Sequence, residues 1–226
     1  MYKLIHHQLC PFSRQIRVLM SELEIEYSMS REDYWLRRGE FLSNNPSASL
    51  PILVIEEDGQ KLGPIIGYYP IVEFLHEKFD KFYLMPDNFI LLSEIRKYIF
   101  WFNDKFFKEV TKVIVDEKVI RPLTRSGEPR SDYLRAAKNN LNHHFKILEN
   151  ILENNSYLVS DKVTLADIVA ASHVSIVDYF GEIQWDLWPL IKHWYSILKS
   201  RPAFRLVLAD RIPGLNPPSY YLDPDF

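Results

Sequence analysis

The N-terminal run YKLIHHQLCPFSRQIRVLMSEL, residues 2–23, contains the change of pattern from which the rest of the chain can be interpreted. Its first part alternates weakly and ends near a proline, which predicts a strand over residues 2–7. Pro11 suits the first position of a helix, because its missing N–H would be unpaired there, and this places Cys10 at the N-cap. From Phe12 onward the apolar residues recur at the spacing of one helix face: Ile16, Leu19, Met20 and Leu23.

The chain up to residue 82 continues this unit. Ile25–Ser30 predicts a second strand, and Leu50–Ile55 predicts a buried strand that opens with a Leu-Pro pair. The Asp-Gly hairpin signal in Glu57–Gln60 leads to a short return strand at Lys61–Gly63. A helix follows, with its apolar face at Ile71, Phe74, Leu75 and Phe79. We expect a βαβαββα order and a small α/β domain over residues 1–82.

The second half of the chain has helical spacing throughout. Residues 89–120 and 131–152 carry apolar side chains at the helical period, and a loop rich in proline and charge separates them. A last helix is expected over residues 188–208, with Arg201-Pro202 inside it. These segments predict an all-α domain at residues 87–208.

A helix start is predicted at Val163–Ile168. Thr164 would cap the helix, and Asp167 would return a hydrogen bond to the capping residue. At the other end of the domain, residues 209–226 form a Pro-rich tail, for which the prolines favour an extended arm.

Composition limits the class of protein. The chain has 226 residues, of which 47% are hydrophobic and 25% charged, with a net charge of −3. This suits a globular protein and lacks the basic excess of a nucleic-acid-binding surface. Its single cysteine allows no internal disulfide, its N-terminus does not resemble a signal peptide, and no apolar run reaches the roughly 18 residues of a membrane span. We therefore expect a cytoplasmic protein.

Four features in this order resemble the glutathione transferase superfamily. Cys10–Ser13 lies between the first strand and the first helix, and Leu50-Pro51 lies where that fold has a cis-proline at its third strand. Thr164 and Asp167 match the capping box of the family's buried helix, and Trp194–Pro202 matches the end of its last core helix. The resemblance implies a thioredoxin-like α/β domain joined to an all-α domain.

A narrower resemblance is to the bacterial cell-division members of that superfamily, which bind the tubulin-like GTPase FtsZ. It rests on His6–Arg14, on Pro213–Leu215 and on the acidic-aromatic end Asp223–Phe226. It implies a non-catalytic regulator that binds FtsZ filaments, in the cytoplasm and at the division site.

That resemblance implies partner-binding residues at Trp35, Leu134, Lys138, Asp223, Asp225 and Phe226. A simpler interpretation exists for several of them. Trp35 could pack on the edge of its own domain, and Lys138 could face water as most helix-surface lysines do. The tail tyrosines Tyr220 and Tyr221 are expected to pack back on the body.

Cys10 has two interpretations. A thiol at a helix N-cap faces unpaired N–H groups and the positive end of the helix dipole, which stabilise a thiolate, and Arg14 and Arg17 would add positive charge. It would then act as a nucleophile or as a contact to the sulfur of glutathione. Alternatively it is an inert remnant of the fold. Ser13, in place of a second cysteine, excludes a dithiol redox cycle.

Glutathione, if bound, would by the resemblance contact Cys10, Ser13, Leu50, Pro51 and Tyr68. Family members usually carry a Glu-Ser pair at the start of the third helix, where this chain has Gly67-Tyr68 and no acid in residues 63–70. Loss of such a charge-assisted contact costs about 1.5–3 kcal/mol. We therefore expect no cofactor and no catalytic residue. The alternative is a cysteine-type glutathione S-transferase or thiol transferase that uses Cys10.

Two further expectations concern metals and assembly. The pairs His6-His7 and His143-His144 are adjacent, so their rings point in different directions and do not suggest a metal site; His173 is expected to be a core residue. The aromatic cluster Phe100–Phe102 with Phe106-Phe107 exceeds what one helix face buries. It predicts a homodimer, or else burial against neighbouring helices.

Overall fold

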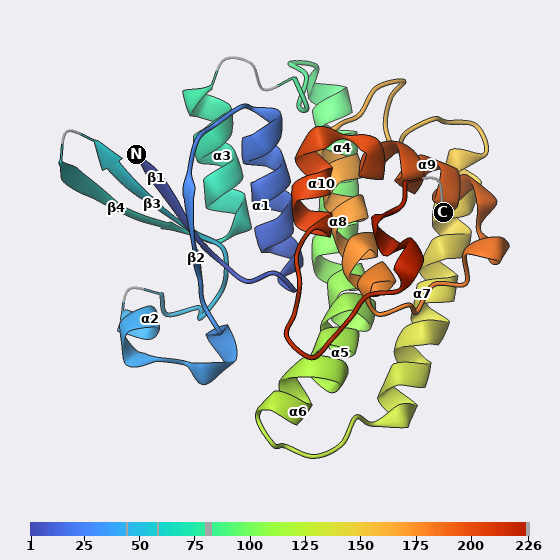
Figure 1. Cartoon of the computed structure of the whole chain (residues 1–226). Coiled ribbons are helices and arrows are strands. Elements are labelled where there is room, and N and C mark those ends of the chain that lie inside the picture. The colour runs from blue at the N-terminus through green and yellow to red at the C-terminus, as the bar shows by residue number, and fades with distance from the viewer. Residues whose placement is uncertain (44, 58, 80–82, 225–226) are drawn as a thin grey trace. The chain divides into compact units, whose positions relative to one another are not determined.

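The structure is a computed structural model that describes residues 1–43, 45–57, 59–79 and 83–224. The chain divides into two compact units, Met1–Phe82 and Tyr83–Phe226 (Figure 1). The first is α/β and the second all-helical, as the sequence predicts. None of the helices in these residues combines the length and the apolar character that a membrane crossing needs.

The first unit is a four-stranded mixed sheet with helices. Its elements are β1 (Tyr2–His6), α1 (Pro11–Glu22), β2 (Ser28–Arg31), α2 (Gly39–Ser43), β3 (Ile52–Glu57), β4 (Gln60–Ile66) and α3 (Tyr68–Lys78). The strand order is β2-β1-β3-β4, with β1 and β2 parallel and the other pairs antiparallel. The ring of Tyr2 packs against Phe74 and Phe79 on the α3 side of the sheet. Because side chains alternate along a strand, Lys3 and Ile5 point to the opposite face.

All four strand predictions differ from the structure at their ends. Strand β1 ends at His6, one residue before the predicted end, and β3 spans Ile52–Glu57 in place of the predicted Leu50–Ile55. Ile25 lies outside β2, because Glu24 has a φ of +55° and the Ile25 N–H donates to the carbonyl oxygen of Met20. Ile25 therefore closes the turn after α1, and β2 begins only at Ser28. Strand β4 is longer than predicted, because its antiparallel pairing with β3 continues to the pair Ile52–Ile66.

The second unit is built around a buried central helix. A continuous helical segment comprises α4 (Phe89–Phe100), a π-helical stretch Trp101–Thr111, α5 (Lys112–Val115), a second π-helical stretch Asp116–Ile120 and α6 (Arg121–Leu123). It is followed by α7 (Ser131–Leu152), α8 (Leu165–Tyr179), α9 (Pro189–Ser200) and α10 (Pro202–Leu208). Every residue of α8 is buried, and α8 packs against α4, the first π-helical stretch and α9 (Figure 1).

The capping box predicted at the start of α8 is present. The Asp167 carboxylate accepts hydrogen bonds from the backbone N–H and the hydroxyl of Thr164, both at 2.9 Å. Its other oxygen accepts from the N–H of Leu158 and from Nε1 of Trp194. One buried carboxylate thus joins the start of α8 to the preceding loop and to α9.

Two predictions for the C-terminal part are wrong. The helix expected over 188–208 is two helices, because Arg201 has extended backbone (ψ 133°) where Pro202 begins α10. The tail is not simply an extended arm, since Ser219–Leu222 forms a 3-10 turn. Tyr221 is fully buried edge-to-face against Tyr179, as expected of a tail tyrosine that packs on the body.

Candidate functional site

Cys10 occupies the N-cap of α1, as predicted. Its backbone is extended (φ −87°, ψ 114°), and its Sγ accepts a hydrogen bond from the N–H of Ser13 at 3.4 Å. The thiol in turn lies 3.8 Å from the carbonyl oxygen of Leu50, to which it donates. Only 8% of the residue is exposed. The sulfur is therefore enclosed between the start of α1 and the loop before β3.

The thiolate expected from the N-cap position is not favoured in this setting. Burial is the largest influence and raises the pKa of the Cys10 thiol, because the low dielectric penalises the charged form. The hydrogen bonds from Ser13 and Phe12 and the charge of Arg14 act in the other direction and do not offset it. Helix-dipole reasoning alone neglects the desolvation of a buried thiol, so the direction of this pKa shift favours the inert interpretation of Cys10 over the nucleophile.

The proline predicted to be cis is cis, at the Leu50-Pro51 bond. The Pro51 carbonyl oxygen accepts a hydrogen bond of 2.9 Å from the N–H of Gly67, which connects this loop to the start of α3. Leu50 and Ile52 pack with Cys10 and with Phe41 of α2 in one apolar cluster. Phe41 was missed by sequence reasoning, because the pair Phe41-Leu42 lies in a polar and charged stretch without a helical period.

The start of α3 lacks the groups that would hold a γ-glutamyl carboxylate and amine. Gly67 caps the helix with φ +91°, and no side chain is present there to receive a ligand. Tyr68 is 4% exposed and its ring lies 6.4 Å from that of Phe12. In the described part of the chain its hydroxyl has no hydrogen-bond partner, and burial raises the pKa of Tyr68 well above its ordinary value. The buried ring of Tyr68 thus occupies the position at which family members usually carry a serine.

The five residues that would contact glutathione are buried and are linked to one another by contacts and hydrogen bonds. Ser13 is fully buried, and its hydroxyl accepts from the N–H of His7 at 3.4 Å. Cys10 and Leu50 are in direct contact, and Pro51 is linked through Gly67 to the helix that begins with Tyr68. The arrangement offers no exposed nucleophile and no carboxylate. Its chemistry is that of a packed core.

The residues proposed to bind a partner are distributed over both units. In the first unit Trp35 is half-buried in the 3-10 turn Tyr34–Leu36, with its ring 4.8 Å from that of His7, edge to face. In the second unit Leu134 and Lys138 are half-buried on α7, and Asp223 is exposed just after the docked turn. Asp225 and Phe226 lie outside the described residues.

The histidine expected to be a core residue is one. His173 is fully buried, with its ring nitrogens 2.9 Å from the Thr111 hydroxyl and 3.0 Å from the Asn103 amide oxygen. Burial lowers the pKa of His173 to about 3, so the ring is neutral at physiological pH. No group of three potential metal ligands occurs among the residues that the structure describes.

Comparison with known proteins gives matches along nearly the whole chain. Residues 9–78 match the family model of the glutathione S-transferase N-terminal domain, and residues 104–202 match that of the C-terminal domain. The chain is 37% identical to FtsZ-localized protein A of Caulobacter vibrioides, over 98% of this chain and 96% of that protein.

Solved structures agree with this. The structure of FzlA from C. crescentus superposes with a TM-score of 0.95 at 36% identity, covering 100% of this chain and 99% of that one. A glutathione S-transferase from Rhodospirillum rubrum gives 0.93 at 35%, with both chains fully covered. One from Sinorhizobium meliloti gives 0.92, also at 35% with both chains fully covered.

Proposed function

The chain belongs to the glutathione S-transferase family, and from that premise we propose that it is a non-catalytic regulator of bacterial cell division that binds FtsZ filaments. It would act in the cytoplasm, at the division site. No bond is made or broken in this function. The protein would bind subunits of the polymer and alter the curvature and stability of the filament.

The observation that carries the proposal is the closed thiol site in a chain that aligns over its whole length with an FtsZ-localized protein. The buried Cys10 thiol and the buried Tyr68 argue against glutathione binding at the starts of α1 and α3. The similarity to FtsZ-localized protein A covers 98% of this chain. Both points favour a protein that keeps the fold and uses its surface.

A homodimer would suit this role, because two equivalent sites on one particle gain avidity for a polymer without any new contact. The aromatic cluster expected at such an interface is mostly core, since Phe102 and Phe106 are buried. Phe100, however, is 64% exposed and Phe89 75% exposed, about three helical turns apart on the same side of α4. We expect light scattering to give a dimer for the wild type and a monomer for Phe100→Glu.

The tail supports a partner surface that is ordered in advance. Tyr221 and the carbonyl of Tyr220 hold the turn against the body, and Asp223 follows in the exposed part. A segment that is already docked loses less entropy when a partner binds. On the second unit, Leu134, Lys138, Asp225 and Phe226 are further proposed contacts, and Trp35 is a separate proposed contact on the first unit.

Co-sedimentation with polymerised FtsZ from the same bacterium tests the proposal. We expect the wild-type protein to pellet with the polymer and Asp223→Lys to pellet at least tenfold less. Asp161→Lys, which makes the same charge change at another exposed position, should pellet like the wild type. Failure of the wild-type protein to pellet with well-formed polymer would exclude FtsZ binding.

A cysteine-type transferase is the second candidate, favoured by the retained N-cap cysteine and by the 35% identity to two structures described as glutathione S-transferases. Turnover of glutathione with an electrophile that is abolished by Cys10→Ser would establish this alternative. Absence of both turnover and glutathione binding would leave Cys10 a structural residue.

A further inference from the structure

The sheet face opposite α3 carries an ordered pattern of side chains. In one row across the strands, Ser28, Lys3, Val54 and Pro64 are register partners; in the next, Ser30, Ile5, Ile52 and Ile66 are. Strand β2 therefore contributes hydroxyls, β1 a lysine beside an isoleucine, and β3 and β4 aliphatic groups. The pattern is polar at one edge and apolar toward the other.

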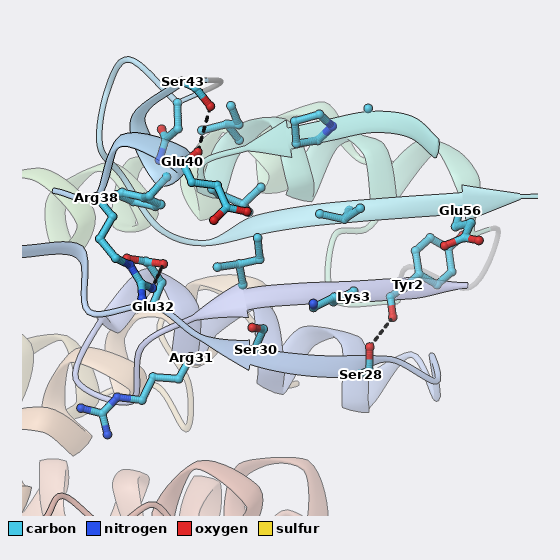
Figure 2. A pocket seen from close by; sticks show the side chains of 18 of the residues that line it. Tyr2, Lys3, Ser28, Ser30, Arg31, Glu32, Arg38, Glu40, Ser43 and Glu56 are labelled. Carbon is cyan, nitrogen blue, oxygen red and sulfur yellow. Dashed lines mark hydrogen bonds and ion pairs between the residues drawn. The ribbon is translucent and has the colours of Figure 1, made fainter. Parts of the chain in front are cut away.

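These rows form the floor of a cavity of about 730 Å³, a size typical of small-molecule sites (Figure 2). Helix α2 closes one end, where Phe41 packs with Ile52 and is joined by Ile5, Val54 and Ile66. From β1 to β4 this apolar strip spans two interstrand steps of about 4.8 Å each, or roughly 10 Å. The strip matches the length of a medium-length hydrocarbon chain.

The charges at the two ends of the cavity differ in how they are paired. At the α2 end, Arg38 Nη2 donates to Glu32 Oε2 at 2.5 Å, and Glu40 adds a further negative charge near Arg38. At the other end the ammonium of Lys3 is exposed and makes no ion pair or hydrogen bond with any described residue. Figure 2 shows Lys3 between the labelled side chains of Ser30 and Ser28, at a distance from Arg38 and Glu32.

Two further charged groups lie at this end, the carboxylate of Glu56 and the N-terminal ammonium of Met1. The ammonium of Met1 donates to the backbone oxygen of Glu56, so this second cation lies close to Glu56. Two cations and one carboxylate leave a net positive charge at the Lys3 end. An anion placed there would meet the ammonium of Lys3 and the hydroxyl of Ser30, whereas the Ser28 hydroxyl donates to the Tyr2 carbonyl oxygen at 3.5 Å.

We propose that this cavity binds a small amphipathic anion, a medium-length acyl chain ending in a carboxylate. The carboxylate pairs with Lys3 and accepts from the Ser30 hydroxyl, and the chain covers the apolar strip of Ile5, Val54, Ile52 and Ile66. The site lies entirely within the first unit and involves neither Cys10 nor the tail. It is therefore independent of the proposed role in cell division.

Titration calorimetry of the full-length protein with octanoate, together with amide chemical shifts in an ¹⁵N-labelled sample, tests the proposal. We expect octanoate to bind and to shift the amides of β1 and β2 around Lys3 and Ser30. Lys3→Glu should weaken binding at least tenfold. Lys146→Glu, which makes the same charge change at an exposed position on α7, should bind as the wild type does.

Octylamine is the matched control ligand, with the same chain and the opposite charge. It should bind at least tenfold more weakly than octanoate to the wild type, and Lys3→Glu should remove or reverse this preference. Lys3 is exposed, so its replacement is expected to leave the melting temperature unchanged, which a thermal scan checks. No binding of octanoate up to 10 mM (about −2.7 kcal/mol), equal binding of octylamine, or amide shifts confined to the second unit would each overturn the proposal.

Discussion

The thiol of Cys10 lies 3.8 Å from the carbonyl oxygen of Leu50 and donates to it, so the sulfur that caps α1 is also hydrogen-bonded to the loop that precedes β3. A thiol that donates a hydrogen bond to a carbonyl oxygen is in its protonated form. The contact therefore connects the local structure of two segments to the chemical state of the side chain most suited to catalysis.

Slow reaction of Cys10 with thiol reagents is the first prediction. Because burial raises its pKa, the thiolate population at pH 7.5 is smaller than that of a free cysteine. We expect labelling by iodoacetamide to be at least tenfold slower in the native protein than in urea, where the pKa returns to about 8.5. Equal rates in the two states would contradict the enclosed thiol.

The same group gives a signed pH dependence. Above about pH 8.5 the unfolded chain releases the thiol proton while the folded chain retains it, so stability falls as pH rises from there toward the folded pKa. The difference in free energy of unfolding between wild type and Cys10→Ala should therefore be constant up to pH 8 and change above it.

Two tyrosine-to-phenylalanine replacements should change stability in opposite directions. Tyr68→Phe removes a buried hydroxyl that has no partner among the described residues, so we expect a gain of about 1 kcal/mol. Tyr179→Phe removes a hydroxyl that donates to the Leu215 carbonyl oxygen at 2.6 Å and accepts from the Ile212 N–H at 3.1 Å. It should cost about 1–2 kcal/mol. Urea unfolding measures both, and a loss for Tyr68→Phe would disprove the unpaired hydroxyl.

Removal of the Asp167 carboxylate should destabilise the helical unit strongly. Asp167→Ala leaves the N–H groups of Leu158 and Thr164 and the indole N–H of Trp194 without their acceptor, and we expect a loss of about 3–5 kcal/mol. Replacing the donor, as in Trp194→His or Trp194→Phe, would remove packing together with the hydrogen bond. The better variant to compare with Asp167→Ala is therefore Asp167→Asn, which keeps the side-chain volume and one acceptor oxygen. Its cost, measured by circular dichroism at 222 nm during urea unfolding, should be smaller than that of Asp167→Ala.

Lys199 should make stability rise with pH. Burial lowers its pKa to about 8 against the opposing attraction of Asp178 and Asp223, whereas the unfolded value is about 10.4. Between these values the unfolded chain binds more protons, so the folded state gains stability as pH rises. Below pH 8 the full penalty of the buried charge applies.

Lys199→Met tests this directly. The variant should be more stable than the wild type at pH 7 by about 1–3 kcal/mol, with the difference shrinking toward pH 10. It also loses the contact of Nζ with the Tyr220 carbonyl oxygen, so the gain is an upper bound. Cys10 lowers the free energy of unfolding over part of this pH range in both proteins. The quantity to follow is therefore the difference in free energy of unfolding between Lys199→Met and the wild type at each pH. A difference independent of pH would contradict the buried ammonium.

The sequence predicted more of the fold than of the site. Periodicity located α1, α7 and the start of α8, because an amphipathic face and a capping box are local features. It failed at Ile25 and at Pro202, where a left-handed residue and an extended residue end one element and begin another. At the site the family resemblance named Cys10, Pro51 and Tyr68, which the structure places in one region, and their contact with glutathione stays a prediction.

What the sequence by itself determined is therefore the order of elements, the absence of an acid at the start of α3, and the N-cap position of Cys10. Each depends only on residues close together in the chain. Only the tertiary structure decided that the Cys10 thiol keeps its proton, that Tyr68 is closed over, and that Lys3 faces an apolar strip. Those properties depend on desolvation and on strand register, which bring together side chains from distant segments and which no local pattern encodes.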